Sequence, residues 1–84
     1  MSDLLDDLLA RNTPETTDDG WRSCHELVMQ AAAERPDLWE DTDRCHRKML
    51  ELIHLKAATM ERSRRQRPGR FGEMWMTYVY RRKR

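Results

Sequence analysis

The sequence predicts an all-α fold, in which a short N-terminal helix and a C-terminal aromatic segment flank an antiparallel helical hairpin. Apolar residues recur at helical spacing in two long segments. The first is 19–34, and the second begins at residue 36 or 42 and ends at residue 66. Only a short connection separates these segments, which favours antiparallel neighbours. A chain of 84 residues buries a modest core, so we expect one small domain.

Residues 1–11 are expected to form a short acidic amphipathic helix, and residues 12–18 a linker to the domain at 19–84. A helix of this length does not persist alone in water, so its apolar stripe must dock on something. Docking on the chain's own domain is the commoner outcome for such a stripe. The alternative is a partner protein, and the candidate partner-binding residues are Leu4, Leu5, Leu8 and Leu9.

The first hairpin helix is predicted over 19–34, with Asp18 or Asp19 as its cap and Pro36 ending it. The second begins either at Pro36 or at Thr42 and continues to residue 66, because no glycine or proline interrupts 37–67. Its apolar face carries Cys45, Met49, Leu52, Ile53 and Met60.

The segment 71–80 has two interpretations. Phe71, Met74, Trp75, Tyr78 and Val79 form a helical stripe, whereas the aromatic and β-branched composition favours a strand. A helix is preferred because no other segment offers a second strand. If 71–80 is a strand, its partner comes from another chain, which would make a homodimer.

Charge is distributed unevenly along the chain. The net charge is +1, yet residues 1–43 carry −9 and residues 44–84 carry +10. This asymmetry suggests that the C-terminal half meets an anionic surface. No apolar run is long enough to cross a bilayer, and two cysteines fit free thiols in a reducing compartment, so we expect a cytoplasmic protein without a membrane partner.

The doublets Cys24-His25 and Cys45-His46 supply zinc-type ligands. Adjacent helical residues point about 100° apart, so one doublet does not easily aim both side chains at one ion, and we predict no metal. His54 is expected to be an ordinary interface residue. No nucleophile–base arrangement or phosphate loop is recognisable, so we expect a non-enzymatic protein without a cofactor.

The basic C-terminal half is the predicted functional region. Arginine suits phosphate and base-edge contacts, and Trp75, Tyr78 and Tyr80 offer faces for base stacking. The expected partner is nucleic acid or a nucleoprotein machine. The alternative is a protein-binding regulator, adaptor or inhibitor that docks through the N-terminal helix and the acidic half. Candidate nucleic-acid-binding residues are Arg64, Arg65, Arg67, Arg70, Trp75, Tyr80, Arg81, Arg82, Lys83 and Arg84.

Overall fold

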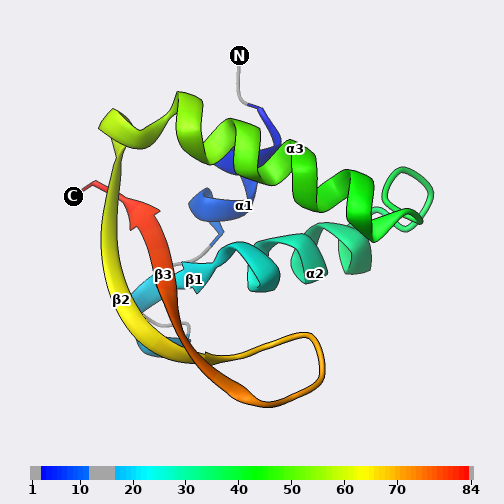
Figure 1. Ribbon diagram of the computed structural model, residues 1–84. Coiled ribbons are helices and arrows are strands. Elements are labelled where there is room, and N and C mark those ends of the chain that lie inside the picture. The colour runs from blue at the N-terminus through cyan, green and yellow to red at the C-terminus, as the bar shows by residue number, and fades with distance from the viewer. Residues whose placement is uncertain (1–2, 12–16, 84) are drawn as a thin grey trace.

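The computed structural model describes residues 3–11 and 17–83, which form three α-helices and a three-stranded antiparallel sheet (Figure 1). The helices are α1 (Leu4–Ala10), α2 (Cys24–Glu34) and α3 (Thr42–Leu55), and the strands are β1 (Arg22–Ser23), β2 (Met60–Pro68) and β3 (Met74–Arg82). Two short 3-10 turns, η1 (Thr17–Gly20) and η2 (Ala57–Thr59), complete the order. The predicted all-α architecture, built on a helical hairpin, is therefore wrong.

The sheet has the order β1-β3-β2. β2 and β3 pair along their full lengths, from Met60 opposite Arg82 to Pro68 opposite Met74, whereas β1 contributes only two residues. The predicted helix over 71–80 is thus a strand. Its main partner is β2 of the same chain, not a strand from another chain.

A tight turn joins β2 to β3. The backbone N–H of Gly69 donates to the carbonyl of Glu73 at 2.7 Å, and that of Gly72 donates to the carbonyl of Gly69 at 3.1 Å. Gly72 has φ 86°, a left-handed conformation that glycine adopts without the steric cost of a Cβ. Three-residue hairpin loops commonly end in such a residue.

The starts and ends of the helices correct the sequence prediction in part. α2 begins after Ser23, which caps it through two reciprocal hydrogen bonds. The Ser23 hydroxyl accepts from the N–H of Glu26, and the Glu26 carboxylate accepts from the N–H of Ser23. The predicted cap at Asp18 or Asp19 is therefore wrong. α2 does end before Pro36, as predicted. α3 takes the later of the two starts, with Asp41 as its cap, but it ends at Leu55 rather than at residue 66.

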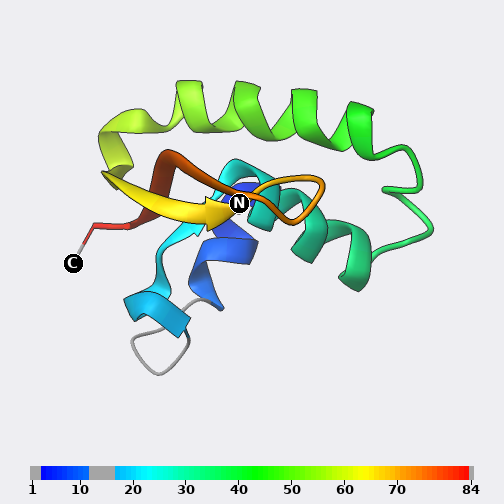
Figure 2. The ribbon, with the colours of Figure 1, turned by 60° about the horizontal axis from the view of Figure 1, so that its bottom comes forward.

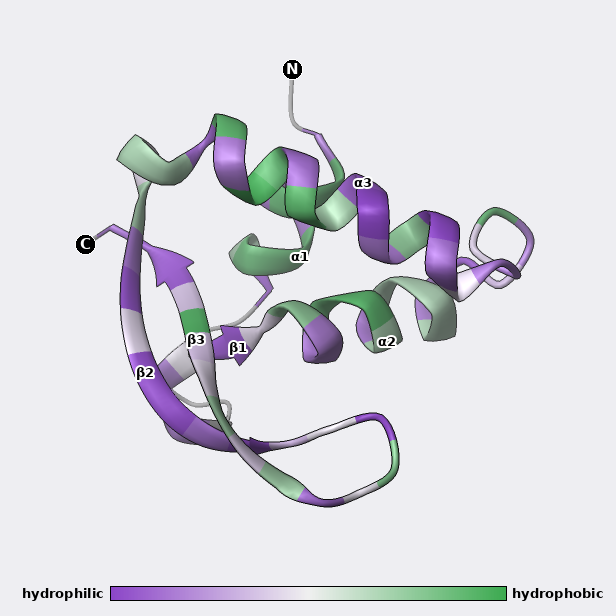
Figure 3. Cartoon of the chain, in the orientation of Figure 1, coloured by the Kyte–Doolittle hydropathy of each residue, from purple (hydrophilic) through white to green (hydrophobic). Residues whose placement is uncertain are grey.

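The core lies where the three helices meet the sheet. α2 and α3 run in opposite directions, and α1 lies between them and β3 (Figures 1 and 3). The buried cluster consists of Leu5, Leu8, Leu9, Leu27, Val28, Ala31, Cys45, Met49, Leu52, Ile53 and Met60. Figure 2 shows that the β2–β3 hairpin has α3 on one side and η1 on the other. The hairpin therefore has two faces with different surroundings.

Candidate functional site

Strand geometry sorts the arginines of the hairpin onto its two faces. Successive side chains of a strand point to opposite sides, and residues paired across an antiparallel ladder share a side. Arg62 is opposite Tyr80 and Arg64 is opposite Tyr78. We call the face with Arg62, Arg64, Tyr78 and Tyr80 the α3-side face, and the face with Glu61, Arg65, Arg67, Trp75 and Arg81 the η1-side face.

Carboxylates of the acidic half neutralise the arginines of the η1-side face. Arg65 pairs with Asp18 at 2.9 Å, and Arg67 pairs with Asp18 and with Glu26. Arg81 contacts Asp19 and Glu61, each at 2.5 Å. These three predicted site residues are thus occupied by ion pairs within the chain.

Trp21 covers the same cations. Its side chain is buried, and its ring lies 5.4 Å from the Arg65 guanidinium and 4.2 Å from that of Arg81. Asp18 and Asp19 both have positive φ, at 53° and 58°, which aspartate tolerates better than most residues. This local reversal places the two carboxylates beside the η1-side face, so the turn and the ion pairs stabilise one another.

The α3-side face has a different electrostatic character. The guanidinium groups of Arg62 and Arg64 lie over the Tyr78 ring, at 4.3 and 5.8 Å from its centroid. Both arginines are exposed, and neither forms an ion pair with any residue in 3–11 or 17–83. Tyr78 itself is 44% exposed. The face therefore offers uncompensated positive charge next to an accessible aromatic ring.

Trp75 and Arg70 lie apart from this face. By strand alternation Trp75 lies on the η1-side face, and its indole N–H donates to the Glu73 carboxylate at 2.9 Å. Its ring lies directly over Gly69, since a Cβ built there would be 2.5 Å from the ring. Arg70, in the hairpin loop, is 3.9 Å from Asp43. The structure thus does not bring Trp75 together with Tyr80.

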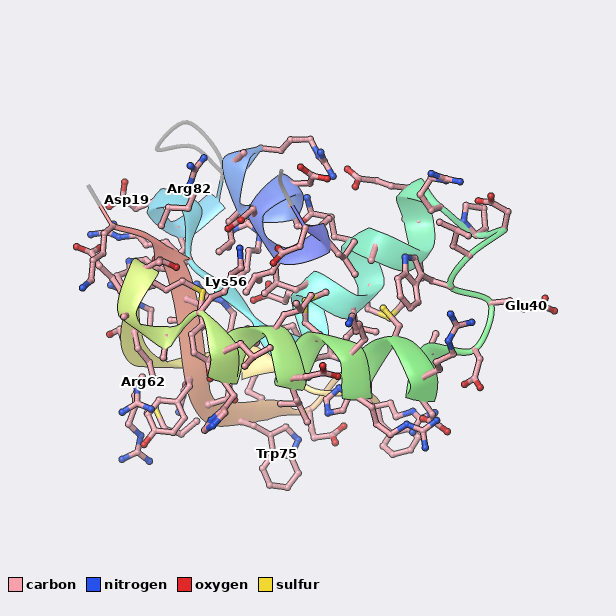
Figure 4. All side chains as sticks on the ribbon, turned by 90° about the horizontal axis from the view of Figure 1, so that it is seen from above. Asp19, Glu40, Lys56, Arg62, Trp75 and Arg82 are labelled. Carbon is pink, nitrogen blue, oxygen red and sulfur yellow. The ribbon has the colours of Figure 1, made fainter. Side chains whose placement is uncertain are left out.

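The remaining predicted cations lie near the end of β3. Arg82 and Lys83 line a separate depression with Lys56 and Asp6, and Figure 4 shows Arg82 on the opposite side of the molecule from Arg62. Arg84 lies outside the described residues. Of the predicted residues that the structure describes, Arg65, Arg67 and Arg81 are ion-paired on the η1-side face, Arg64 and Tyr80 lie on the α3-side face, and Arg82 and Lys83 line this depression.

The leucines of α1 are part of the chain's own core. Leu5, Leu8 and Leu9 are buried, and Leu4 packs against the same cluster. Lys56 holds the polar side of α1 through Asp3 at 2.8 Å and Asp6 at 2.5 Å. Of the two alternatives for this helix, docking on its own domain is the one found.

The two cysteine–histidine doublets meet through one residue of each, since Cys24 Sγ is 3.8 Å from His46 Nδ1. Cys24 and Cys45 are both free thiols. No group of three or more histidine, cysteine, aspartate or glutamate side chains is placed to hold a metal in the described ranges. Burial, reinforced by the nearby Cys45, raises the pKa of Cys24 to about 11, so this thiol stays protonated near neutral pH.

Two residues of the α3-side face, Arg62 and Tyr78, are outside the predicted list, although the sequence predicts Tyr78 as a stacking face. Reading 60–68 with a strand period of two would have grouped Arg62 with Arg64. None of the helices described is long and apolar enough to span a bilayer. Comparisons with protein-family models, curated proteins and solved structures give no match.

Proposed function

We propose that this protein is a non-enzymatic nucleic-acid-binding protein that contacts its target, free or within a nucleoprotein complex, through the α3-side face of the β2–β3 hairpin. The observation that carries the proposal is the unequal neutralisation of the two faces. Arg65, Arg67 and Arg81 are paired with carboxylates, whereas Arg62 and Arg64 pair with no carboxylate in the part of the chain that the structure describes. Free guanidinium groups can neutralise phosphates and release their counterions.

Two further features support a nucleic acid as the anionic partner. Tyr78 supplies a partly exposed ring beside the cations, and base–aromatic stacking is a general way of holding nucleic acids. The thioethers of Met74 and Met76 extend the same face with exposed apolar surface. We also place the protein in the cytoplasm, in keeping with the free thiols of Cys24 and Cys45.

The test is a double variant, Arg62→Ala with Arg64→Ala, assayed for binding to single-stranded and duplex oligonucleotides across a salt series. A matched control, Arg11→Ala with Arg35→Ala, removes the same charge from exposed ion pairs with Glu34 and Asp37, away from the hairpin. If both hairpin arginines contact phosphates of a single strand, the log–log salt slope should fall by about 1.4, at about 0.7 per phosphate.

The control variant should keep the wild-type slope, because its arginines are far from the proposed face. Failure of the wild-type protein to bind any oligonucleotide at low salt would refute the proposal. An equal loss in both variants would also refute it, since net charge rather than the α3-side face would then govern binding.

A further inference from the structure

An open cleft lies between the second half of α3 and the α3-side face of the hairpin. Its volume is about 560 Å³, which is within the range of about 300 to 1,000 Å³ typical of small-ligand sites. The helical side contributes Leu50, Ile53, His54 and Ala57, and the sheet side contributes Met60, Arg62 and Tyr80. The cleft therefore adjoins the cations of the proposed binding face.

The cleft combines an apolar interior with a positive rim. Ile53 and Met60 are buried members of the core cluster, while Leu50 is 48% exposed at the surface. Arg62 borders the cleft and stacks over Tyr78. No carboxylate lines the cleft among the described residues. A ligand that fits this site thus combines an apolar part, for the cleft, with an anionic group, for Arg62.

The polar groups of the cleft can contact the edge of such a ligand. The Tyr80 hydroxyl makes no hydrogen bond with any other described residue. Burial raises the pKa of Tyr80, so the hydroxyl is neutral and can both donate and accept. His54 contributes an imidazole to the same cleft, and Arg62 contributes donors only.

We propose that the cleft receives one unpaired nucleobase of a bound strand, with Arg62 contacting the adjoining phosphate, so that the protein selects single-stranded over duplex nucleic acid. This inference rests on the proposed function and names the class of nucleic acid. Bases in a duplex are paired and stacked, so they do not enter a cleft unless they are flipped out. An acidic peptide brings an aromatic ring to the cleft only where an aromatic residue adjoins its carboxylate, whereas every nucleotide of a strand carries both a base and a phosphate.

The test compares three fluorescent probes of equal length: an oligothymidylate, the same backbone without bases, and a duplex. Wild-type protein should bind the oligothymidylate about 5- to 150-fold more tightly than the abasic strand, the factor that base stacking provides. It should also prefer the oligothymidylate to the duplex. Equal affinity for the oligothymidylate and the abasic strand would overturn the inference while leaving the proposed function intact.

A cleft-filling variant tests whether the preference for the oligothymidylate arises in the cleft. Ala57→Trp introduces an indole at a residue that lines the cleft, and Ala58→Trp is the matched control at an exposed neighbour that does not. Ala57→Trp should weaken oligothymidylate binding about 5-fold or more, the loss of one base contact, without changing abasic binding, whereas Ala58→Trp should bind like wild type. Retention of the full preference by a folded Ala57→Trp variant would overturn the inference. Absence of binding to all three probes at low salt would refute both proposals.

Discussion

Replacing Leu8 by alanine tests whether α1 belongs to the folded core. Leu8 is fully buried in the cluster formed by the three helices and Met60. Truncating a buried leucine to alanine removes its transfer free energy and leaves a cavity, which together cost about 2–5 kcal/mol. An 84-residue domain has a free energy of unfolding of only about 4–13 kcal/mol at the usual 0.05–0.15 kcal/mol per residue.

The loss should be visible as a large fall in melting temperature. Each kcal/mol shifts the melting temperature of a domain of this size by about 4–8 °C, so even a destabilisation of about 2 kcal/mol lowers the melting temperature by about 8 °C. Thermal unfolding followed by circular dichroism measures it. Asp7→Ala is the control, since Asp7 lies on the same helix but is exposed, and a surface substitution should change stability by less than about 0.5 kcal/mol.

Two results would refute this reasoning. One is a Leu8→Ala variant that melts like the wild type, which would mean that the leucine side chain is not buried in solution. The other is a chain lacking residues 1–11 that unfolds with the same midpoint as the full chain. Either result would restore the interpretation of α1 as an element that docks on a partner protein.

Two further predictions follow from ionisable groups. With its pKa raised to about 11, Cys24 should be thiolate in only about one molecule in a thousand at pH 8, against about one in ten for an ordinary value of 9.0, so its reaction with a disulfide reagent should be about 100-fold slower in native than in denatured protein. Equal rates would contradict the burial. Burial alone would raise the pKa of Asp3, but hydrogen bonds from Lys56 and from the Asp6 backbone lower it below 3.8. The stabilisation that ionised Asp3 gives the fold is therefore present above about pH 4 and is lost as the pH falls through the folded-state pKa. Lys56→Met should therefore destabilise the protein more at pH 6 than at pH 3 in chemical denaturation, and a penalty independent of pH would argue against the contact.

Local signals in the sequence account for the parts of the fold that could be predicted. The leucine stripe of α1, the stop before Pro36 and a start of α3 at Thr42 all depend on neighbouring residues. The start of α2 was readable too, because Ser23 followed three residues later by Glu26 is a capping-box pattern.

β2 could not be predicted in the same way. The segment 60–68 carries arginines on both faces, so its alternation shows no contrast between apolar and polar residues. Arginine is also a good helix former, and no breaker precedes Pro68. Pairing with β3, across the tight turn at 69–73, determines its conformation. Without β2, the strand composition of 74–82 had no visible partner.

The candidate site could be predicted in composition but not in arrangement. The arginines and aromatic residues were identified as a group, yet the group included Arg65, Arg67 and Arg81, which bind carboxylates of the same chain. Two structural facts separate these three arginines from Arg62 and Arg64. The alternation of side chains along the strands places them on the other face of the hairpin, and the left-handed turn at Asp18 and Asp19 brings carboxylates to that face.

The outer edge of β2 has a consequence for how copies of this protein behave at high concentration. β2 lies at the margin of the sheet, and its far side has no strand against it among the described residues. Edge strands invite indiscriminate self-association, and charged side chains are a common defence. Two β2 strands aligned edge to edge would bring Arg62, Arg64, Arg65 and Arg67 of one molecule near those of the other. Mutual repulsion of these rows should keep the protein dispersed, and concentrated salt should weaken that protection.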